Sequence, residues 1–113
     1  MNVVAPVSSH PQHLRALARA NEIRLARAAL KRRIADGRMP AAGVILESPW
    51  EAASMTVADV LMSQRRWGIT RCRKVLSAVQ ISETKTVGAL TERQRRALAW
   101  RLESGVAPQP VFA

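Results

Sequence analysis

The amino-acid sequence predicts an all-α fold, in which a long N-terminal helix is followed by a compact helical domain. A stretch rich in Ala, Leu and Arg runs from about residue 13 to residue 36 without Gly or Pro, as is typical of a long helix. Two later segments open with helix-capping signatures, at Thr56 and at Thr91. No segment alternates with the period of two that strands show, and no Asn-Gly or Asp-Gly turn joins two β-branched runs.

Length and composition predict a single domain. The chain has 113 residues, 48% of them hydrophobic, so it can bury an aliphatic core without a disulfide or a metal. Its one cysteine, Cys72, excludes an intramolecular disulfide framework and fits a reducing, cytoplasmic compartment. No apolar run approaches the roughly 20 residues of a membrane span, and the first twelve residues lack the Lys or Arg of a signal peptide. We therefore expect an intracellular protein without a membrane partner.

The two ends of the chain differ from its middle. Residues 1–12 contain two prolines and two serines and are expected to form a flexible N-terminal arm. A single helical domain is predicted over residues 13–103, with its long helix at about 13–36 and its compact part at about 40–103. Residues 104–113 are expected to form a C-terminal tail.

The long helix is expected to end at Gly37, because glycine readily takes the left-handed backbone that terminates helices. Apolar and small residues recur along it at spacings of three and four, and we expect the face that they form to pack inward. This face holds Leu14, Leu17, Ala18, Asn21, Leu25 and Ala28.

Four shorter helices are predicted after the long one. Their boundaries come from capping residues and from the prolines and glycines between them. They are Ala41–Glu47, Thr56 to about Ser63, Arg71 to about Val79 with Thr70 as its cap, and a helix to about Leu102 that opens with the capping box Thr91-Glu-Arg-Gln94. Of the three tryptophans, Trp50 and Trp100 are expected in the core, whereas Trp67 either packs under a turn or lies on the surface against a sugar or a base.

Charge is the strongest functional signal. Eighteen Lys and Arg against eight Asp and Glu give a formal net charge of +10. Residues 1–38 carry a net charge of +6, residues 39–64 carry −3, and residues 65–101 carry +8. Because such an excess repels itself in a folded protein, it is usually kept for a polyanion, and nucleic acid is the expected partner.

Catalysis finds little support in the sequence. Both histidines, His10 and His13, lie at the start of the chain, where nothing is expected to position a general base. Cys72 lies among basic residues that would lower the pKa of an exposed thiol, but no base or second cysteine accompanies it, so a small residue beside the core is the favoured interpretation. No phosphate-binding glycine loop or metal-ligand cluster is present. The sequence predicts no enzyme, no cofactor, no metal and no small-molecule substrate.

The most informative stretch runs from Gln64 to Lys74. It contains five basic residues and no acid, and Gly68 separates the end of one predicted helix from the start of the next. Glycine permits a sharp turn and lets a phosphate approach the backbone closely. The N–H groups of Ile69, Thr70 and Arg71 would lie at a helix N-terminus, which attracts anions. The alternative is an ordinary helical corner with surface arginines.

These residues resemble the actinobacterial integration host factor family of small nucleoid-associated proteins. The resemblance covers about residues 14–102, and it depends on an ordered set of short motifs and not on any single one. They are Arg24-x-x-Arg27-Ala28-x-Leu30-Lys31, Met55-x-Val57, Leu61, Gly68-x-x-Arg71, Ile81-Ser82-Glu83 and Leu90-x-x-Arg93-Gln94-x-x-Ala97-Leu98.

The resemblance implies a helix-two-turn-helix domain that binds duplex DNA through its turn, with a lid segment closing on the DNA backbone and the long basic helix reaching a second DNA segment. The implied turn residues are Gln64, Arg65, Arg66, Trp67, Gly68, Ile69, Thr70 and Arg71. Arg73 and Lys74 are added to this site because they place further positive charge around the same helix start. The implied lid residues are Ser82, Thr84, Lys85, Thr86, Arg93 and Gln94. The implied second DNA surface is Arg24, Arg27 and Lys31, which on charge alone could equally be a solvated helix face.

Three departures from the family pattern concern these contacts. The proline that usually precedes the turn is absent, and Ile69 stands after Gly68 where the family often has lysine. The lid has Lys85 where relatives carry several basic residues, so Arg93, Arg95 and Arg96 are expected to supply part of its charge.

Backbone N–H groups and cations contact phosphates and not base edges, so little sequence specificity is expected. The predicted function is therefore that of a cytoplasmic, nucleoid-associated protein that binds double-stranded DNA and bends or bridges it, in chromosome organisation and site-specific recombination. The alternative is an RNA- or ribosome-associated module. A sequence-specific regulator is a weaker alternative, because it would need a symmetric dimer and no sustained heptad is evident.

Overall fold

The computed structural model describes residues 4–104, with side chains described from Pro11 onward. Within these residues every regular element is helical, and the one ladder contact is an isolated antiparallel bridge between Thr56 and Thr86. The predicted all-α fold with a long N-terminal helix is confirmed. The elements are α1 (Val4–Ala35), α2 (Ala41–Glu47), α3 (Val57–Met62), α4 (Ile69–Ala78), the 3-10 helix η1 (Val87–Ala89) and α5 (Glu92–Ser104).

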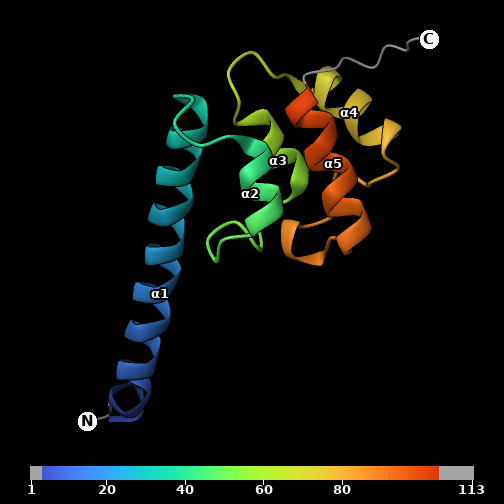
Figure 1. Cartoon of the computed structure of the whole chain (residues 1–113). Coiled ribbons are helices and arrows are strands. Elements are labelled where there is room, and N and C mark those ends of the chain that lie inside the picture. Colours follow the sequence, from blue (N-terminus) through green and yellow to red (C-terminus); the bar gives the residue numbers. More distant parts are fainter. Residues whose placement is uncertain (1–3, 105–113) are drawn as a thin grey trace, which may run out of the picture.

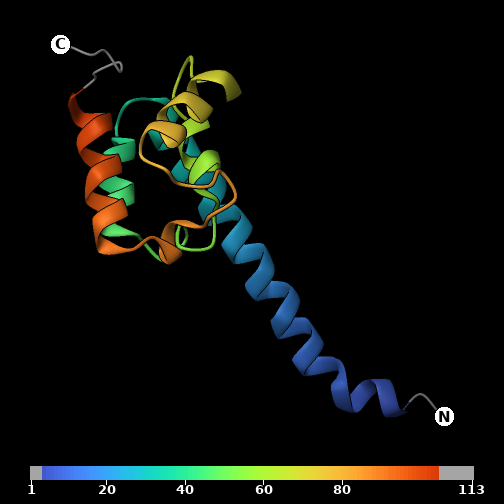
Figure 2. The same ribbon diagram turned by 90° about the vertical axis from the view of Figure 1, so that its right-hand side faces the viewer.

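The molecule consists of a rod and a compact body. Helices α2 to α5 form the body, in which α2 and α5 pack side by side, while α1 extends well beyond it (Figure 1). Figure 2 shows α5 along one side of the body and α1 leaving from the opposite side. The principal extents of 75 × 27 × 23 Å reflect this elongated shape.

Helix α1 begins at Val4, about nine residues before the predicted start near residue 13. The prediction of an arm over residues 1–12 depended on their prolines. Pro6 lies in the first helical turn, where an N–H donor is not needed, and Pro11 lies inside the helix at the loss of one internal hydrogen bond. Residues 1–3 and the predicted tail residues 105–113 lie outside the described residues.

The end of α1 agrees with the prediction. Gly37 has a φ of +78°, and its N–H donates to the Ile34 carbonyl at 3.1 Å. The Arg38 N–H donates to the Arg33 carbonyl at 3.0 Å. This left-handed C-cap turns the chain sharply toward α2.

The apolar face predicted to pack inward is exposed instead. Leu14 is 49% exposed, Leu17 54% and Leu25 61%, whereas Leu30 and Ile34 are buried in the body. Leu25 and Ile34 are nine residues apart, so at about 100° per residue they lie on opposite sides of the helix. The helix docks through a second apolar stripe, and only its last turns meet the body.

Two of the predicted caps are confirmed, and the third is wrong. The Asp59 N–H donates to Thr56 Oγ1 at 3.1 Å at the start of α3. In the capping box of α5, the Gln94 N–H donates to Thr91 Oγ1 at 3.1 Å and the Thr91 N–H donates to Gln94 Oε1 at 3.0 Å. Helix α4, however, begins at Ile69 with Gly68 as its N-cap, so Thr70 is a helical residue and not the cap.

The core is aliphatic, and two of the tryptophans lie outside it. Trp50 is 58% exposed and Trp100 65%, which contradicts their predicted burial. Trp50 lies in the connection after α2, and Trp100 lies on the solvent side of α5, because Leu98 and Ala99 occupy the buried side. The fully buried large side chains are Leu30, Val44, Ile45, Val57, Val60, Leu61, Leu76, Val87 and Leu98.

Candidate nucleic-acid interface

Two consecutive turns connect α3 to α4. The Gln64 N–H donates to the Leu61 carbonyl and the Trp67 N–H donates to the Gln64 carbonyl, both at 3.2 Å. The Gln64 side chain holds the first turn, because its Nε2 also donates to the Leu61 carbonyl at 3.1 Å. The left-handed residue of this connection is Arg66, with a φ of +69°, and not Gly68. These contacts form the helix-two-turn-helix arrangement.

The N-terminus of α4 is called uncapped here, because its N-cap residue is a glycine, which has no side chain to accept a hydrogen bond. Gly68 has an extended backbone (φ −97°, ψ −177°), and no side chain caps the helix. The first helical hydrogen bond is donated by the Cys72 N–H to the Gly68 carbonyl at 3.1 Å, so the N–H groups of Ile69, Thr70 and Arg71 precede the hydrogen-bonded turns. These donors and the helix dipole favour an anion at this point.

Gly68 is not required by its own backbone. A φ of −97° is open to any residue, and a Cβ atom at this position would meet nothing within 4 Å. The expectation that Gly68 makes the turn possible is therefore wrong. Its missing side chain leaves open space in front of the uncapped helix, so a ligand could approach the backbone closely there.

Cations lie close to this N-terminus in the sequence. Arg65, Arg66 and Lys74 are exposed, and no protein group in the described part of the chain pairs with them. Arg73 Nε lies 3.2 Å from a carboxylate oxygen of Glu83 and is therefore partly neutralised.

Trp67 supports the turn from beneath. Its ring is half-buried and packs against the core. The Arg71 guanidinium lies over this ring, 4.3 Å from its centroid. Of the two predicted positions for Trp67, packing under the turn agrees with this placement. The stack holds the Arg71 side chain close to the uncapped N-terminus.

Cys72 lies beneath the basic surface and is fully buried. Burial raises the pKa of the Cys72 thiol, the Glu83 carboxylate raises this pKa further, and only Arg73 acts in the opposite direction. The expected lowering of its pKa by neighbouring cations would have required exposure. The interpretation of Cys72 as a small core residue agrees with its burial.

Backbone hydrogen bonds attach the predicted lid to the connection between α2 and α3. The Val57 N–H donates to the Lys85 carbonyl at 2.8 Å, and the Val87 N–H donates to the Met55 carbonyl at 3.0 Å. The Gly88 N–H donates to the Ala53 carbonyl at 2.9 Å. A Cβ atom at Gly88 would lie only 3.0 Å from that carbonyl oxygen, so a larger residue would crowd this close approach.

The predicted lid side chains do not act as one group. The Ser82 and Thr84 hydroxyls hydrogen-bond each other at 2.9 Å, while Lys85 and Thr86 are half-buried. Gln94 serves the capping box of α5. Arg93 is exposed.

Of the three arginines expected to add charge to the lid, two have internal partners. Arg95 donates to the Ile45 carbonyl at 2.7 Å and to the Val87 and Leu90 carbonyls at 3.1 Å, so it joins α2, η1 and α5. Arg96 pairs with Glu92 at 2.9 Å. Arg95 binds backbone carbonyls, and two of its acceptors come from other elements of the chain. Because every residue has a backbone carbonyl, no sequence motif could have predicted that Arg95 joins these elements.

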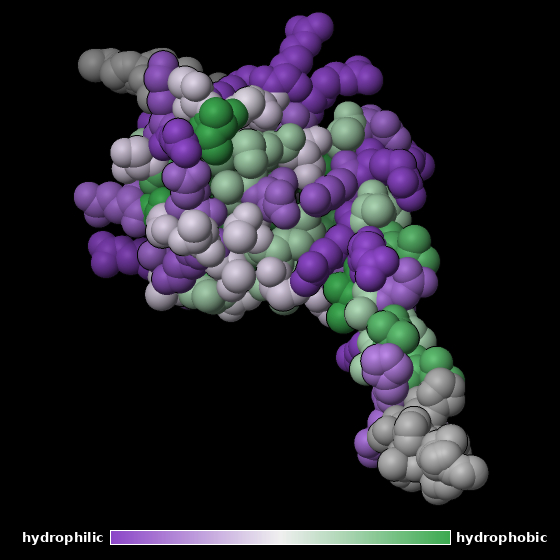
Figure 3. All heavy atoms as spheres, turned by 180° about the vertical axis from the view of Figure 1, so that it is seen from behind, coloured by the Kyte–Doolittle hydropathy of each residue, from purple (hydrophilic) through white to green (hydrophobic). Residues whose placement is uncertain are grey.

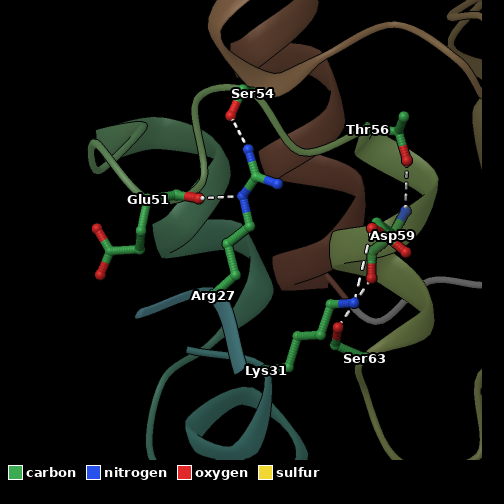
Figure 4. Close-up of polar contacts among 7 residues, drawn as sticks. All are labelled: Arg27, Lys31, Glu51, Ser54, Thr56, Asp59 and Ser63. Carbon is green, nitrogen blue, oxygen red and sulfur yellow. Dashed lines mark hydrogen bonds and ion pairs between the residues drawn. The ribbon is translucent and has the colours of Figure 1, made fainter. Parts of the chain in front are cut away.

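The predicted second DNA surface on α1 divides into two parts. Arg27 donates to the Glu51 carbonyl at 3.4 Å and to Ser54 Oγ, and Lys31 Nζ lies 3.7 Å from an Asp59 carboxylate oxygen. Figure 4 shows both side chains directed from α1 toward the body. Arg24 has only a 3.4 Å contact with Asn21 on its own helix.

The docked end of α1 lies beside the turn. Two adjoining open hollows share Ala35; one is lined by Arg32 and the other by Gln64 and Arg65. Figure 3 shows hydrophilic side chains gathered over this end of the body and the adjoining part of the rod. Arg32, which lies near the start of this turn, is not among the predicted site residues. The basic last turn of the long helix was the available signal.

No group of three or more His, Cys, Asp or Glu side chains in residues 11–104 could hold a metal ion. No helix in the described ranges is long and apolar enough to span a membrane.

Comparisons with known proteins identify the fold. No family model matches the chain, and no curated protein does. Among solved structures, sIHF, the Streptomyces integration host factor, determined in complex with an 8-bp palindromic DNA, has a TM-score of 0.68 and 24% sequence identity. The match covers 75% of this chain and 98% of that one. The chain therefore has the fold of the integration host factor sIHF, as its sequence resemblance predicted.

Proposed function

We propose that the protein binds duplex DNA through the phosphate backbone, as an integration-host-factor-like, nucleoid-associated protein without enzymatic activity. The observation that carries this proposal is the N-terminus of α4, which no side chain caps and which opens onto the bare Gly68. The exposed, unpaired cations Arg65, Arg66 and Lys74 lie close to it in the sequence. The fold adds support, because sIHF was solved bound to DNA.

The turn is the proposed primary contact. Backbone N–H groups of Ile69, Thr70 and Arg71 would donate to one phosphate, and Arg65, Arg66 and Lys74 would contact its neighbours. The Trp67 ring would hold the Arg71 guanidinium in place. Gln64 and Arg73 are engaged within the protein and are proposed to position the turn and not to bear its main charge. Such contacts distinguish sequences weakly.

The lid and the long helix are proposed as secondary contacts. Arg93 is the lid cation best placed for a phosphate, because it is exposed, and the hydroxyls of Ser82, Thr84 and Thr86 could add hydrogen bonds. We propose that Arg24 contacts a second DNA segment, while Arg27 and Lys31 set the direction of α1. Reaching two segments would let the protein bend or bridge DNA, which suits chromosome organisation and site-specific recombination.

The proposal is tested by titrating the protein with one short duplex over a salt series. If six to ten phosphates are neutralised, affinity should fall by about 10³–10⁵-fold between 50 and 200 mM salt. Binding that is absent at low salt, or independent of salt, contradicts the proposal. Competition by structured RNA of the same length checks the RNA alternative: the DNA proposal expects the duplex to compete better, and stronger competition by RNA overturns it.

A further inference from the structure

Two open hollows meet on the solvent-facing side of α4. Arg73 and Ser77 are both exposed, and they line both hollows because residues four positions apart share one face of a helix. The other lining residues of the first hollow are Thr70, Lys74 and Ala78, and those of the second hollow are Leu76, Ile81, Ser82 and Glu83.

The first hollow has the chemistry of a phosphate-binding surface. Arg73 and Lys74 supply cations, the hydroxyls of Thr70 and Ser77 can donate hydrogen bonds, and no carboxylate is among the lining residues. Thr70 belongs to the first turn of α4, and Ser77 lies about 10 Å further along the helix axis. Because one DNA strand carries a charge about every 3.4 Å of its axis, this length can take more than one phosphate.

Arg73 is shared with an acidic residue of the second hollow. Its Nε lies 3.3 and 3.2 Å from the two carboxylate oxygens of Glu83. The Nη groups of Arg73 have no hydrogen-bond partner among the described residues. The pair is open to solvent, since the Arg73 side chain is 63% exposed and that of Glu83 is 38% exposed. An ion pair so exposed contributes little to stability, so Arg73 can exchange one anionic partner for another.

The segment that follows α4 holds Glu83 in this position. The Ile81 N–H donates to the Leu76 carbonyl at 2.9 Å, and the Ile81 side chain is buried. The Ser82 and Thr84 hydroxyls, on either side of Glu83 in the chain, hydrogen-bond each other at 2.9 Å. Backbone and side-chain contacts thus attach the carboxylate to the end of α4, beside the guanidinium that it pairs with.

We propose that Arg73 and Ser77 form a second phosphate site on α4 and that the Glu83 carboxylate competes with the DNA phosphate for it. This inference rests on the proposed DNA binding by the turn and extends that binding along the helix. In the parent protein the carboxylate neutralises the guanidinium and repels the phosphate. Glu83 therefore limits the affinity for DNA, and a neutral residue of the same shape in its place should open the site.

Glu83→Gln tests the competition, because glutamine keeps the shape of the side chain and removes its charge. The affinities of the parent and of the variant for one short duplex are measured over a salt series. The variant should bind roughly three- to tenfold more tightly at 50 mM salt, and its salt slope should be steeper by about one. Glu22→Gln, at an exposed position on the projecting part of α1, makes the same change in net charge. This matched control should bind within about twofold of the parent.

Arg73→Gln in both backgrounds shows whether Glu83 acts through Arg73. In the parent the guanidinium is already neutralised, so its loss should change duplex affinity by less than about twofold. In the Glu83→Gln background the same loss should remove most of the gain in affinity and the extra salt slope. Ser77→Asp, which places a carboxylate in the site, should remove this gain as well. Ala16→Asp, on the projecting part of α1, makes the same change in net charge and should not.

The parent protein distinguishes failure of this site from failure of the proposed function. If the parent does not bind the duplex at low salt, the proposed DNA binding is wrong, and the second phosphate site is wrong with it. If the parent binds but Glu83→Gln binds no more tightly than Glu22→Gln, only the second phosphate site is overturned. An equal gain from Glu83→Gln in the presence and absence of Arg73 also overturns it, because the carboxylate would then act by repulsion alone.

Discussion

The turn between α3 and α4 and the docked end of α1 are both rich in cations, and they use them differently. Arg65, Arg66 and Lys74 of the turn are exposed without a protein partner in the described residues. On α1, Arg27 and Lys31 bind acceptors in the α2–α3 connection and in α3. The cations of the turn, which the fold offers no acceptor, are therefore the better candidates for contact with nucleic acid.

Removing the turn cations is expected to have the largest effect. The triple variant Arg65→Gln, Arg66→Gln and Lys74→Gln should weaken binding to a short duplex by about 2–3 kcal/mol and lower the salt slope by about three. The matched control removes three charges from the rod, at Arg15, Arg19 and Arg24, and should leave short-duplex affinity nearly unchanged. Equal losses in the two triples would mean that net charge alone, and not the turn, drives binding.

Arg27 is expected to affect folding more than DNA binding. Arg27→Gln removes its contacts with Glu51 and Ser54, which should lower the free energy of unfolding by about 1–2 kcal/mol. Arg24→Gln, one turn earlier and without a partner in the body, should change it by less than about 0.5 kcal/mol. Urea denaturation of the two variants makes the comparison, and equal stabilities would remove the assigned docking role of Arg27.

Substitution of Arg66 is expected to change stability and DNA affinity in opposite directions. Its left-handed backbone is unfavourable for a residue with a side chain, so Arg66→Gly should raise the free energy of unfolding by up to about 1 kcal/mol. The same change removes an exposed cation, so duplex affinity should fall. A variant that becomes both less stable and a tighter binder would contradict both assignments.

The buried thiol under the turn should give the smallest effect, at alkaline pH. Burial raises the pKa of Cys72 above its unfolded value, so the folded state holds its proton when the unfolded state has begun to lose it. The contribution of the Cys72 thiol to the free energy of unfolding is complete below the ordinary thiol pKa and is lost as the pH rises above it. Near pH 9 this loss is expected to be less than about 1 kcal/mol. The free energies of unfolding of the parent and of Cys72→Ala are measured over a pH series. At alkaline pH this free energy should fall more steeply in the parent.

The local signals of the sequence predicted local structure well. Thr56 and the Thr91–Gln94 box cap their helices as predicted, because capping depends on residues three positions apart. Gly37 ends the long helix for the same local reason.

Contacts between elements distant in the sequence were harder to predict. The long helix has two apolar stripes, one through Leu14 and Leu25 and one through Ile23, Leu30 and Ile34, and periodicity alone does not decide which one docks. Arg95 is similar, since its acceptors are backbone carbonyls brought together only by folding. In the candidate site, the sequence identified the basic turn but assigned the strained backbone to Gly68 instead of Arg66.

The central claim is that the uncapped N-terminus of α4 is an anion site for DNA phosphate. Gly68→Asp tests it directly, because aspartate is a good N-cap and its carboxylate would occupy the site itself. The variant should be as stable as the parent or more stable, yet bind a short duplex at least about tenfold more weakly, equivalent to about 1.4 kcal/mol.

Gly68→Asn is the matched control for this measurement. It caps the helix with nearly the same shape but without the negative charge, so its affinity should lie between those of the parent and the aspartate variant. The affinities of the three proteins for one duplex at one salt concentration, with their stabilities, decide the question. If Gly68→Asp is folded and binds as tightly as the parent, the DNA phosphate does not lie at the start of α4.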